Sequence, residues 1–524
     1  MKRILLFMVL IPALLMSIDG CALSRPDVRG DAPRRIPWAE REFRAVWVAT
    51  VGNIDWPSKP GLSIEEQQRE ARAILDTCTA LNLNAIIFQV RPHCDAMYLS
   101  ELEPWSYYLT GEQGKAPEPF YDPLQFWVKE AHDRGLELHV WFNPYRAHLR
   151  RGADVTPTSI VHKRPDLAKK TDNNTYWLDP GIQEVQDLSY NVVMDVVKRY
   201  DVDGAHFDDY FYPYGDGNFP DDESYDAYKK SGGSMERNDW RRQNVNALIE
   251  RVYKGIKKEK PHVKFGLSPF GIWRPFNPPS IEGYDQYDRL YADARLWLNE
   301  GWVDYWTPQL YWPISQVPQS FPVLLNWWAH ENTKGRNLWP GMNSGRMINT
   351  KGMDEVNNQI MIARGFAPEA PGHVHFSMRA FMRDSTLLRD GLRKTPYQKP
   401  ALVPPSPWLD NTSPATPGVE TNSENDTLVV TWSHKNELDV FRWVVYYQYG
   451  ASWEYKILNK KDRTMPLALT RTAVEHLRTR TGQDSVFTTT RPLARIAVSA
   501  VDRTGNESEL VHQTIATDTA GKTP

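Results

Sequence analysis

The chain has 524 residues, more than one ordinary domain contains, so we expect one large domain and at least one smaller module. Its 62 Lys and Arg residues nearly balance 65 Asp and Glu residues, and the resulting formal net charge of −3 excludes the basic surface of a nucleic-acid-binding protein. A hydrophobic fraction of 41% excludes a disordered chain, and three cysteines exclude a disulfide scaffold. A bridge between Cys78 and Cys94 and two buried free thiols are both compatible with the sequence.

The N-terminal residues predict a secreted protein. A basic start precedes almost wholly apolar residues 4–18, a length that fits a signal peptide over residues 1–20 better than a membrane-spanning helix. The run Ile18-Asp19-Gly20-Cys21 resembles a bacterial lipobox, which implies cleavage before Cys21 and acylation of its sulfur; plain secretory cleavage is the alternative. With a polar tether over residues 21–40, we expect a lipid-anchored protein of the bacterial cell envelope, held at the outer membrane.

Residues 41–398 alternate short apolar runs with helical patterns. Neighbouring runs begin 33 to 67 residues apart, which leaves room for a crossover helix and a loop between parallel strands. Eight such units predict an α/β domain, a (β/α)8 TIM barrel with enlarged loops. A doubly wound sheet is the competing fold, but no glycine-rich phosphate loop follows the first run. The predicted strands are 44–50, 85–90, 137–143, 204–210, 264–271, 305–312, 338–343 and 372–378.

Two of the predicted helices have clear start signals. Ser63 and Glu66 form a capping box that opens a helix over residues 64–81. The pair Asp122-Pro123 places a capping side chain and a first-turn proline before a helix over residues 124–134. Both helices fit the crossover positions of a barrel.

The C-terminal part of the chain predicts a second, all-β domain. Six prolines in residues 399–417 predict an extended linker, and residues 517–524 form a tail. Between them, residues 418–516 contain short segments with strand alternation, which predict a β-sandwich and resemble a fibronectin type III module. We expect no chemistry from this module. The segments are 427–433, 443–449, 453–458 and 494–501.

Polar and aromatic side chains follow the predicted barrel strands, at the end where barrel enzymes place reactive groups. Amides and carboxylates that bind hydroxyl groups, together with rings that cover an apolar sugar face, are typical of a carbohydrate cleft. The candidate substrate-binding residues are Arg91, Asp95, Trp105, Asn143, Arg146, Asp179, His206, Tyr210, Trp273, Gln309, Tyr311, Trp312 and Asn343.

The fourth predicted strand ends in the sharpest signal, the pair Asp208-Asp209. Glycosidases use two carboxyl groups, one ionised and one protonated, and two adjacent aspartates can push each other's pKa values apart. These two residues are therefore the catalytic candidates. The alternative is that one of them caps the following helix.

Several candidates have a structural alternative. Arg91 and Arg146 can pair with carboxylates of the protein instead of with a substrate, Asp179 can cap a helix, and the three tryptophans can pack in the core. Candidates for a separate acid are Asp95, Glu101 and Glu103.

The sequence supports a metal site less well than a carbohydrate cleft. His373 and His375 lie on one face of the eighth predicted strand, but among the other strand ends only His206 offers a further imidazole. We therefore expect no metal and no cofactor.

Seven motifs occur in one order along the predicted barrel: Trp47-Val48-Ala49-Thr50, Gln89-Val90-Arg91-Pro92, Phe142-Asn143-Pro144-Tyr145-Arg146, Leu178-Asp179-Pro180-Gly181, the run from Asp203 to Tyr210, the run from Ser268 to Arg274 and Pro308-Gln309-Leu310-Tyr311-Trp312. Taken together, these motifs resemble the glycosyl-hydrolase-like family 10 lipoproteins of bacteria. The resemblance spans roughly residues 40–395 and implies a barrel related to those of amylases, with activity on glycan chains and, for some members, on peptidoglycan strands without stem peptides.

By analogy with amylase-type barrels, the resemblance implies that Asp208 is the nucleophile or charge stabiliser. The chain departs from that pattern at Ser268-Pro269, where an amylase has its acid glutamate, so the general acid is not assigned. The leading hypothesis is an envelope glycosidase acting on a polysaccharide, namely peptidoglycan glycan. The alternatives are a metal-dependent polysaccharide deacetylase and a glycan-binding lipoprotein without catalysis.

Overall fold

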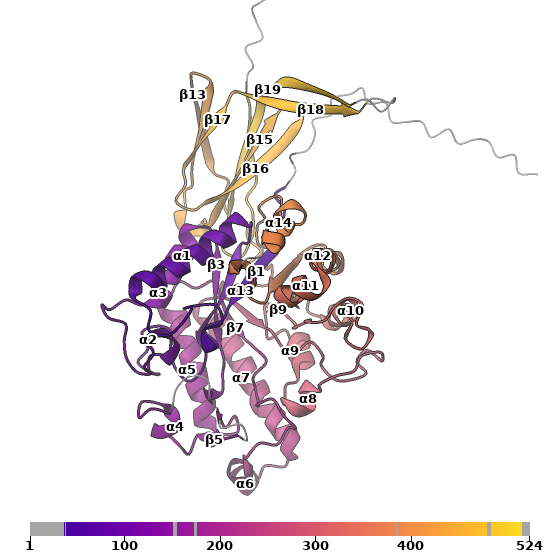
Figure 1. Cartoon of the computed structure of the whole chain (residues 1–524). Coiled ribbons are helices and arrows are strands. Elements are labelled where there is room, and N and C mark those ends of the chain that lie inside the picture. The colour runs from indigo at the N-terminus through magenta and orange to yellow at the C-terminus, as the bar shows by residue number, and fades with distance from the viewer. Residues whose placement is uncertain are drawn as a thin grey trace, which may run out of the picture. The chain divides into compact units, whose positions relative to one another are not determined.

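The computed structural model describes residues 36, 38–149, 155–171, 175–383, 386–478 and 484–515 (Figure 1). The predicted signal peptide, Cys21 and the tail over residues 517–524 lie outside the described residues, as does most of the predicted tether.

A closed parallel sheet forms the large domain, which confirms the predicted (β/α)8 barrel. The strand order is β10-β9-β8-β7-β3-β2-β1-β12-β11, and because β10 and β11 belong to one run of chain, the sheet closes on itself. All eight predicted strand positions are occupied. The strands are β1 (Phe43–Val48), β2 (Ala85–Arg91), β3 (Glu137–Phe142), β7 (Gly204–Phe207), β8 (Lys264–Leu267), β9 (Tyr305–Trp306), β10 (Asn337–Leu338), β11 (Gly341–Met342) and β12 (Gly372–His375).

Helices surround the barrel, and both predicted start signals are present. The Ser63 and Glu66 side chains form the reciprocal capping box, and the Asp122 carboxylate accepts from two first-turn amides. No helix in the described part of the chain is long and apolar enough to cross a membrane. The helices are α1 (Ile64–Ala80), α2 (Tyr107–Thr110), α3 (Pro123–Asp133), α4 (Ile160–Lys163), α5 (Gln183–Arg199), α6 (Asp222–Lys230), α7 (Arg237–Glu259), α8 (Gln286–Arg289), α9 (Ala294–Glu300), α10 (Phe321–Glu331), α11 (Ser344–Lys351), α12 (Met353–Phe366), α13 (Arg379–Met382) and α14 (Thr386–Lys394).

A small antiparallel sheet is inserted after β3. Its order is β4 (Arg146–His148), β6 (Tyr176–Leu178) and β5 (Ala168–Lys170), and it carries Arg146 at its start. The insertion accounts for the long interval between the third and fourth barrel strands.

The interior of the barrel is packed with aromatic rings. Phe43 stacks on Trp339 with ring centroids 4.0 Å apart. Gly266 faces the Tyr305 ring so closely that a Cβ at that position would collide with it. The small residue on one strand therefore makes room for the large one on the next, as in other filled barrels.

The C-terminal domain consists of antiparallel sheets around its own apolar core, consistent with the predicted β-sandwich. The four predicted segments are strands, but others were missed. One of them, β13, is exposed along most of its length and has no apolar alternation that would reveal it. The strands are β13 (Gly418–Glu424), β14 (Thr427–Ser433), β15 (Arg442–Tyr449), β16 (Ser452–Asn459), β17 (Thr464–Ala468), β18 (Thr470–Arg478), β19 (Asp484–Val501) and β20 (Val511–Thr514).

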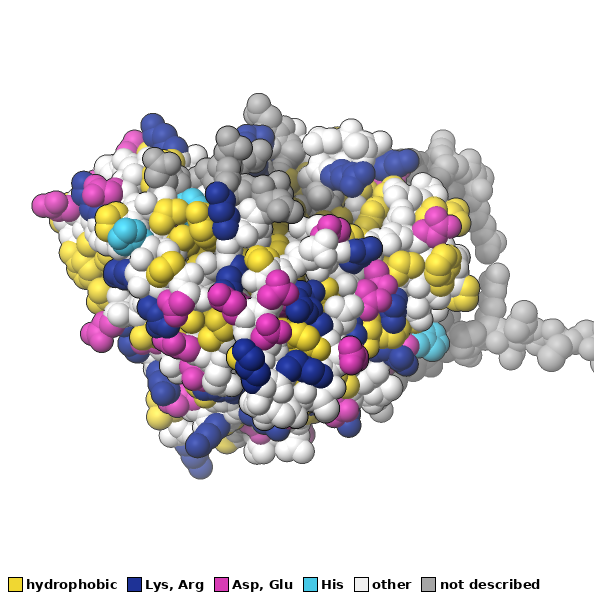
Figure 2. Space-filling model, turned by 90° about the horizontal axis from the view of Figure 1, so that it is seen from below, with side chains coloured by type: hydrophobic (Ala, Val, Ile, Leu, Met, Phe, Trp, Pro, Cys, Tyr) yellow, Lys and Arg dark blue, Asp and Glu magenta, His cyan; other side chains and the backbone are white. Residues whose placement is uncertain are grey.

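The proline-rich segment over residues 399–417 has no helix and no strand beyond a single bridge, but it is not a free spacer. It packs against the end of the barrel where the strands begin: Trp408 Nε1 donates to Asp304 at 2.9 Å, and Asn337 donates to Ser406 at 3.2 Å. The sandwich contacts the same end through Arg503. The opposite end, where the strands finish, is the face seen in Figure 2, with acidic and basic side chains interspersed.

Candidate active site

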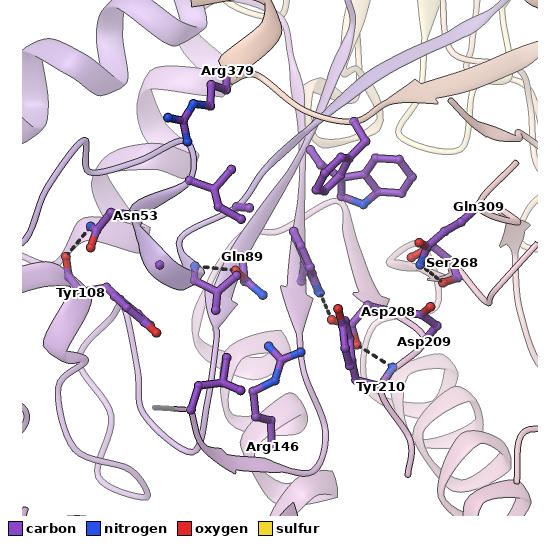
Figure 3. A pocket seen from close by; sticks show the side chains of 18 of the residues that line it. Asn53, Gln89, Tyr108, Arg146, Asp208, Asp209, Tyr210, Ser268, Gln309 and Arg379 are labelled. Atoms are coloured by element: carbon purple, nitrogen blue, oxygen red, sulfur yellow. Dashed lines mark hydrogen bonds between the residues drawn. The ribbon is translucent and has the colours of Figure 1, made fainter. Parts of the chain in front are cut away.

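A cavity of about 770 Å³ opens at the carboxyl ends of the barrel strands (Figure 3). This volume is within the range of small-molecule binding sites. Seven predicted residues line it: Arg146, Asp208, Asp209, Tyr210, Gln309, Tyr311 and Asn343. The remaining lining residues are Trp47, Ala49, Val51, Gly52, Asn53, Ile54, Gln89, Tyr107, Tyr108, Trp141, Leu149, Ser268, Phe376 and Arg379.

Asp208 lies just past the end of β7 and is buried, with three neutral donors around its carboxylate. Trp141 Nε1 donates at 3.0 Å, Asn143 Nδ2 at 3.2 Å and the Tyr210 amide at 3.3 Å. Burial raises the pKa of Asp208, while the nearby Arg146 guanidinium and these donors hold that rise back. The donors and Arg146 therefore oppose the effect of burial, and no ion-pair partner contacts the carboxylate among the described residues.

Asp209, the next residue, is equally buried but less well provided with donors. Burial, and then the negative charge of Asp208, raise its pKa to about 7. The Tyr214 hydroxyl donates to its carboxylate. Because Asp208 has more donors and Arg146 beside it, we expect Asp208 to ionise first and Asp209 to titrate near pH 7.

Arg146 closes one side of this pair. Its guanidinium lies 4.1 Å from the centre of the Tyr210 ring and donates to the Pro92 carbonyl at 3.2 Å. Its buried Nε has no hydrogen-bond partner among the described residues. Figure 3 shows the guanidinium pointing into the cavity, where its N–H groups can bind a polar group of a substrate.

Two predicted substrate-binding residues lie behind the lining. Asn143 is buried and donates to Asp208, so it orients the carboxylate. His206 is buried inside the barrel, where its Nε2 lies 2.9 Å from the Ser268 hydroxyl. Neither side chain lines the cavity.

A row of hydrogen bonds runs from His206 to the base of the barrel. His206 Nδ1 lies 3.0 Å from the Tyr305 hydroxyl, which lies 2.9 Å from His139 Nδ1. His139 Nε2 lies 3.0 Å from Glu137, which accepts from Lys264 at 3.0 Å. The row joins a buried ion pair at the base to the cavity wall.

One contact determines which atoms donate and which accept in the hydrogen bonds around His206. Trp47 Nε1 lies 3.4 Å from His206 Nε2. An indole N–H can only donate, so Nε2 accepts and the proton of His206 is on Nδ1. Burial lowers the pKa of His206 well below its usual value, which keeps the ring neutral. The Ser268 hydroxyl therefore donates to Nε2, away from the cavity.

Three charged candidates are structural instead of lining the cavity, contrary to the prediction. Arg91 is buried against Glu103 and also donates to the Asn143 carbonyl at 2.6 Å. Asp95 is buried, and burial raises its pKa to about 7. Asp179 accepts from the Gly181 amide at 2.9 Å and from Ser224 at 2.6 Å, so it fixes the turn before α5. Loops fold these groups inward, where protein partners bind Arg91 and Asp179.

The three candidate tryptophan platforms also lie away from the cavity. Trp273 stacks on Trp327, Trp312 packs edge-on against Phe270, and Trp105 packs against Phe120. Each ring therefore has an aromatic protein neighbour in place of a sugar.

The sequence reading missed several lining residues. Trp47, Gln89 and Ser268 lie at or near the ends of predicted barrel strands, where reactive groups are expected, so the same argument applied to every strand would have found them. Tyr107 and Arg379 come from loops and short helices, and no periodicity indicated their direction.

The histidine pair on β12 does not face an open position. His375 lies 2.7 Å from the Tyr397 hydroxyl, and His373 contacts the same hydroxyl. Across the described ranges, no three His, Cys, Asp or Glu side chains gather as a metal site would require. Cys78 and Cys94 are free, buried thiols, and burial raises the pKa of each to about 12.

Comparison with known proteins gives consistent matches. Residues 42–356 match the family described as glycosyl hydrolase-like 10. The chain is 39% identical over 497 residues to glycosyl hydrolase YngK of Bacillus subtilis (strain 168), covering 91% of this chain and 94% of that protein. It is 38% identical over 326 residues to glycosyl hydrolase DigH of Escherichia coli (strain K12), covering 58% of this chain and 73% of that protein.

A solved structure with a similar fold is the catalytic domain of β-amylase from Paenibacillus polymyxa. Its TM-score is 0.44 at 13% identity, covering 70% of this chain and 100% of that chain. The assignment to a family rests on the sequence matches, which confirm the resemblance read from the motifs.

Proposed function

This chain belongs to the glycosyl hydrolase-like 10 family, and we propose that it hydrolyses glycosidic bonds of a polysaccharide with Asp208 and Asp209 as its two carboxyl groups. One observation carries the proposal: two adjacent buried carboxyl groups share one cavity, and their surroundings differ, since Asp208 accepts from three neutral donors while the charge of Asp208 helps to raise the pKa of Asp209 to about 7. Glycosidases of both stereochemical outcomes need such a pair.

The proposed mechanism divides the work between the pair. Protonated Asp209 donates its proton to the oxygen of the leaving sugar. Ionised Asp208 stabilises the positive charge that develops on the anomeric carbon, or attacks that carbon directly. A water molecule then adds to the anomeric carbon and gives a proton to the ionised Asp209, which completes the hydrolysis and restores both carboxyl groups. Trp141 and Asn143 hold the Asp208 carboxylate in place through neutral hydrogen bonds that leave its charge available to the substrate.

We further propose peptidoglycan strands without stem peptides as the substrate. The motifs shared with the glycosyl-hydrolase-like lipoproteins support this choice. Aromatic and amide groups in the cavity, including Trp47, Tyr311 and Gln309, suit a sugar chain. Attachment of lipid to Cys21 would hold the enzyme in the cell envelope beside that substrate.

The C-terminal domain is proposed to be a fibronectin type III-related module. Its core strands form a sheet of three, β13-β14-β17, and a sheet in which β16, β15, β19 and β20 are neighbours. A sandwich of this kind is a support or docking unit, consistent with its position at the end of the barrel away from the cavity.

The proposal is tested by incubating the purified full-length chain with amidase-treated glycan strands from sacculi. New reducing ends and shorter oligosaccharides, identified by mass, are the expected result. Release of acetate with intact strands would identify a deacetylase instead. Binding without any change in the strands would identify a glycan-binding protein, and either result would overturn the proposal.

A further inference from the structure

A second cavity of about 450 Å³ lies next to the candidate active site. Both cavities are lined by Ile54, Asn343, Phe376 and Arg379, which form a shared wall. The second cavity is lined further by Gly345, Arg346, Ile348, Asn349, Ser377, Ala380 and Arg383. Adjacent cavities of this kind can receive successive units of one bound chain.

Three arginines give this second cavity its charge. Arg346, Arg379 and Arg383 all line it and are exposed, and no carboxylate of the described residues forms an ion pair with any of them. Other arginines of the barrel are neutralised: Arg241 contacts Asp221 at 2.6 Å, and Arg364 contacts Glu42 at 2.7 Å. Three like charges without an ion-pair partner around one hollow repel one another, and an anion bound between them relieves that repulsion.

The wall between the cavities is held in place from below. The Asp55 carboxylate accepts from the Ala49 amide at 2.7 Å, the Ser377 hydroxyl at 2.8 Å and the Arg379 amide at 2.6 Å. It joins the loop after β1 to the loop after β12. Burial raises the pKa of Asp55 to about 6. The charge of Arg379 lowers the pKa of Asp55, but the Arg379 guanidinium forms no ion pair with Asp55 within contact distance.

Another part of the shared wall, Asn343, is also held by a hydrogen bond. Asn343 lines both cavities, and its side-chain oxygen accepts from the Arg346 amide at 3.0 Å, which caps α11. The lining of the second cavity also includes the apolar side chains of Ile54, Ile348 and Phe376. The second cavity thus offers an apolar surface for a ring and guanidinium groups for an anion, a combination that fits an acidic sugar.

We propose that the second cavity is a subsite for a sugar residue that carries a carboxylate, which Arg346, Arg379 and Arg383 recognise. This inference rests on the proposed glycosidase function and specifies its substrate. In peptidoglycan, the ether-linked lactyl group of muramic acid is such a carboxylate only when the stem peptide is absent, because the peptide converts it to an amide. Guanidinium groups favour the charged form through paired N–H donors.

The test compares two forms of one glycan preparation: strands with free lactyl carboxylates and the same strands with those groups converted to methylamides. The variant is the double substitution Arg346→Gln and Arg383→Gln. Its matched control is Lys351→Gln with Lys394→Gln, which removes two exposed positive charges of α11 and α14 outside the cavity. Circular dichroism melting verifies that both variants are folded.

Wild type and control are expected to show a KM about two- to tenfold lower for the acidic strands, a range set by exposed ion pairs. The arginine variant is expected to lose this preference with little change in kcat, and added salt is expected to reduce it in the wild type. Equal KM values for both strand forms in the wild type, or a preference that survives in the arginine variant, would overturn the subsite while leaving the hydrolase proposal intact.

If neither strand form is cleaved, the proposed function fails and the subsite is tested by binding alone. Calorimetric titration of the wild type with the two forms is then the measurement. Tighter binding of the acidic form, lost in the arginine variant, supports the subsite, and equal binding of both forms refutes it.

Discussion

The strand β7 has an aspartate at each end, and the two differ in what their surroundings do to them. Asp203 precedes the strand at the base of the barrel, and Asp208 follows it at the mouth. Their exposed fractions are almost equal, 4% and 3%. Burial raises the pKa of both, but at Asp203 the partners His132 and Arg503 outweigh burial and hold the pKa well below its usual value.

The difference lies in the charge of the partners. The Asp203 carboxylate lies 2.8 Å from His132 and 3.2 Å from Arg503. The Asp203 charge is therefore compensated within the protein, and it helps the sandwich to bind the barrel. Asp208 receives hydrogen bonds from neutral groups only, so its charge stays available to a ligand. One end of this barrel strand thus carries a compensated charge, and the other carries the carboxylate that we propose to be catalytic.

Removing the charge at the mouth is expected to have the largest effect. Asp208→Asn keeps the shape and loses the carboxylate, so we expect glycan cleavage to fall by about 10³-fold or more. Reducing-end release at saturating substrate measures it. Asp203→Asn serves as the contrast, with kcat unchanged. An active Asp208→Asn enzyme would show that this carboxylate is not catalytic.

Removing the charge at the base is expected to cost stability instead. Asp203→Asn leaves His132 and Arg503 without their buried partner, and because both are partly exposed we expect a loss of about 2–4 kcal/mol in the free energy of unfolding. Denaturant titration measures it. The neighbouring Asp201→Asn, whose carboxylate is largely exposed, should cost less than about 1 kcal/mol. Equal losses in both variants would contradict the comparison.

The smallest expected effect is a shift in the pH profile. Activity should fall as pH rises through about 7, where Asp209 loses its proton, and fall at acid pH as Asp208 gains one. The Tyr214 hydrogen bond lowers the pKa of Asp209, so Tyr214→Phe should move the alkaline limb to higher pH. The pH dependence of kcat/KM measures the pH at which activity falls on the alkaline side.

Tyr284→Phe is the control for that shift. Tyr284 lies beside Tyr214, but its hydroxyl donates to the Gly215 carbonyl instead. The limb of this variant should stay in place. If Tyr214→Phe moves the limb to lower pH or not at all, Asp209 is not the group that titrates there.

The barrel and the position of Asp208 and Asp209 at its mouth followed from the sequence because both depend on periodic or local signals. The strand and helix periods predicted the eight strand–helix units of the barrel. Asp208 and Asp209 were predicted because reactive groups of barrel enzymes lie where the strands end, which we call the strand-end rule. The rule failed for Arg91 and Trp273, since it indicates which end of the barrel a residue is near and not which neighbour its side chain meets. The arginines of the second cavity come from α11 and from the loop and short helix after β12, whose spatial meeting no local pattern encodes.

The row of hydrogen bonds inside the barrel has a consequence for which sugar groups the mouth accepts. With its hydrogen directed inward to His206, the Ser268 oxygen presents only lone pairs to the cavity. It can therefore receive a hydrogen from a free hydroxyl or amide of the glycan, but it has nothing to give to an ether or ester oxygen. A sugar acylated or methylated at the position facing Ser268 would lose this contact, so the barrel interior makes the site sensitive to glycan modification.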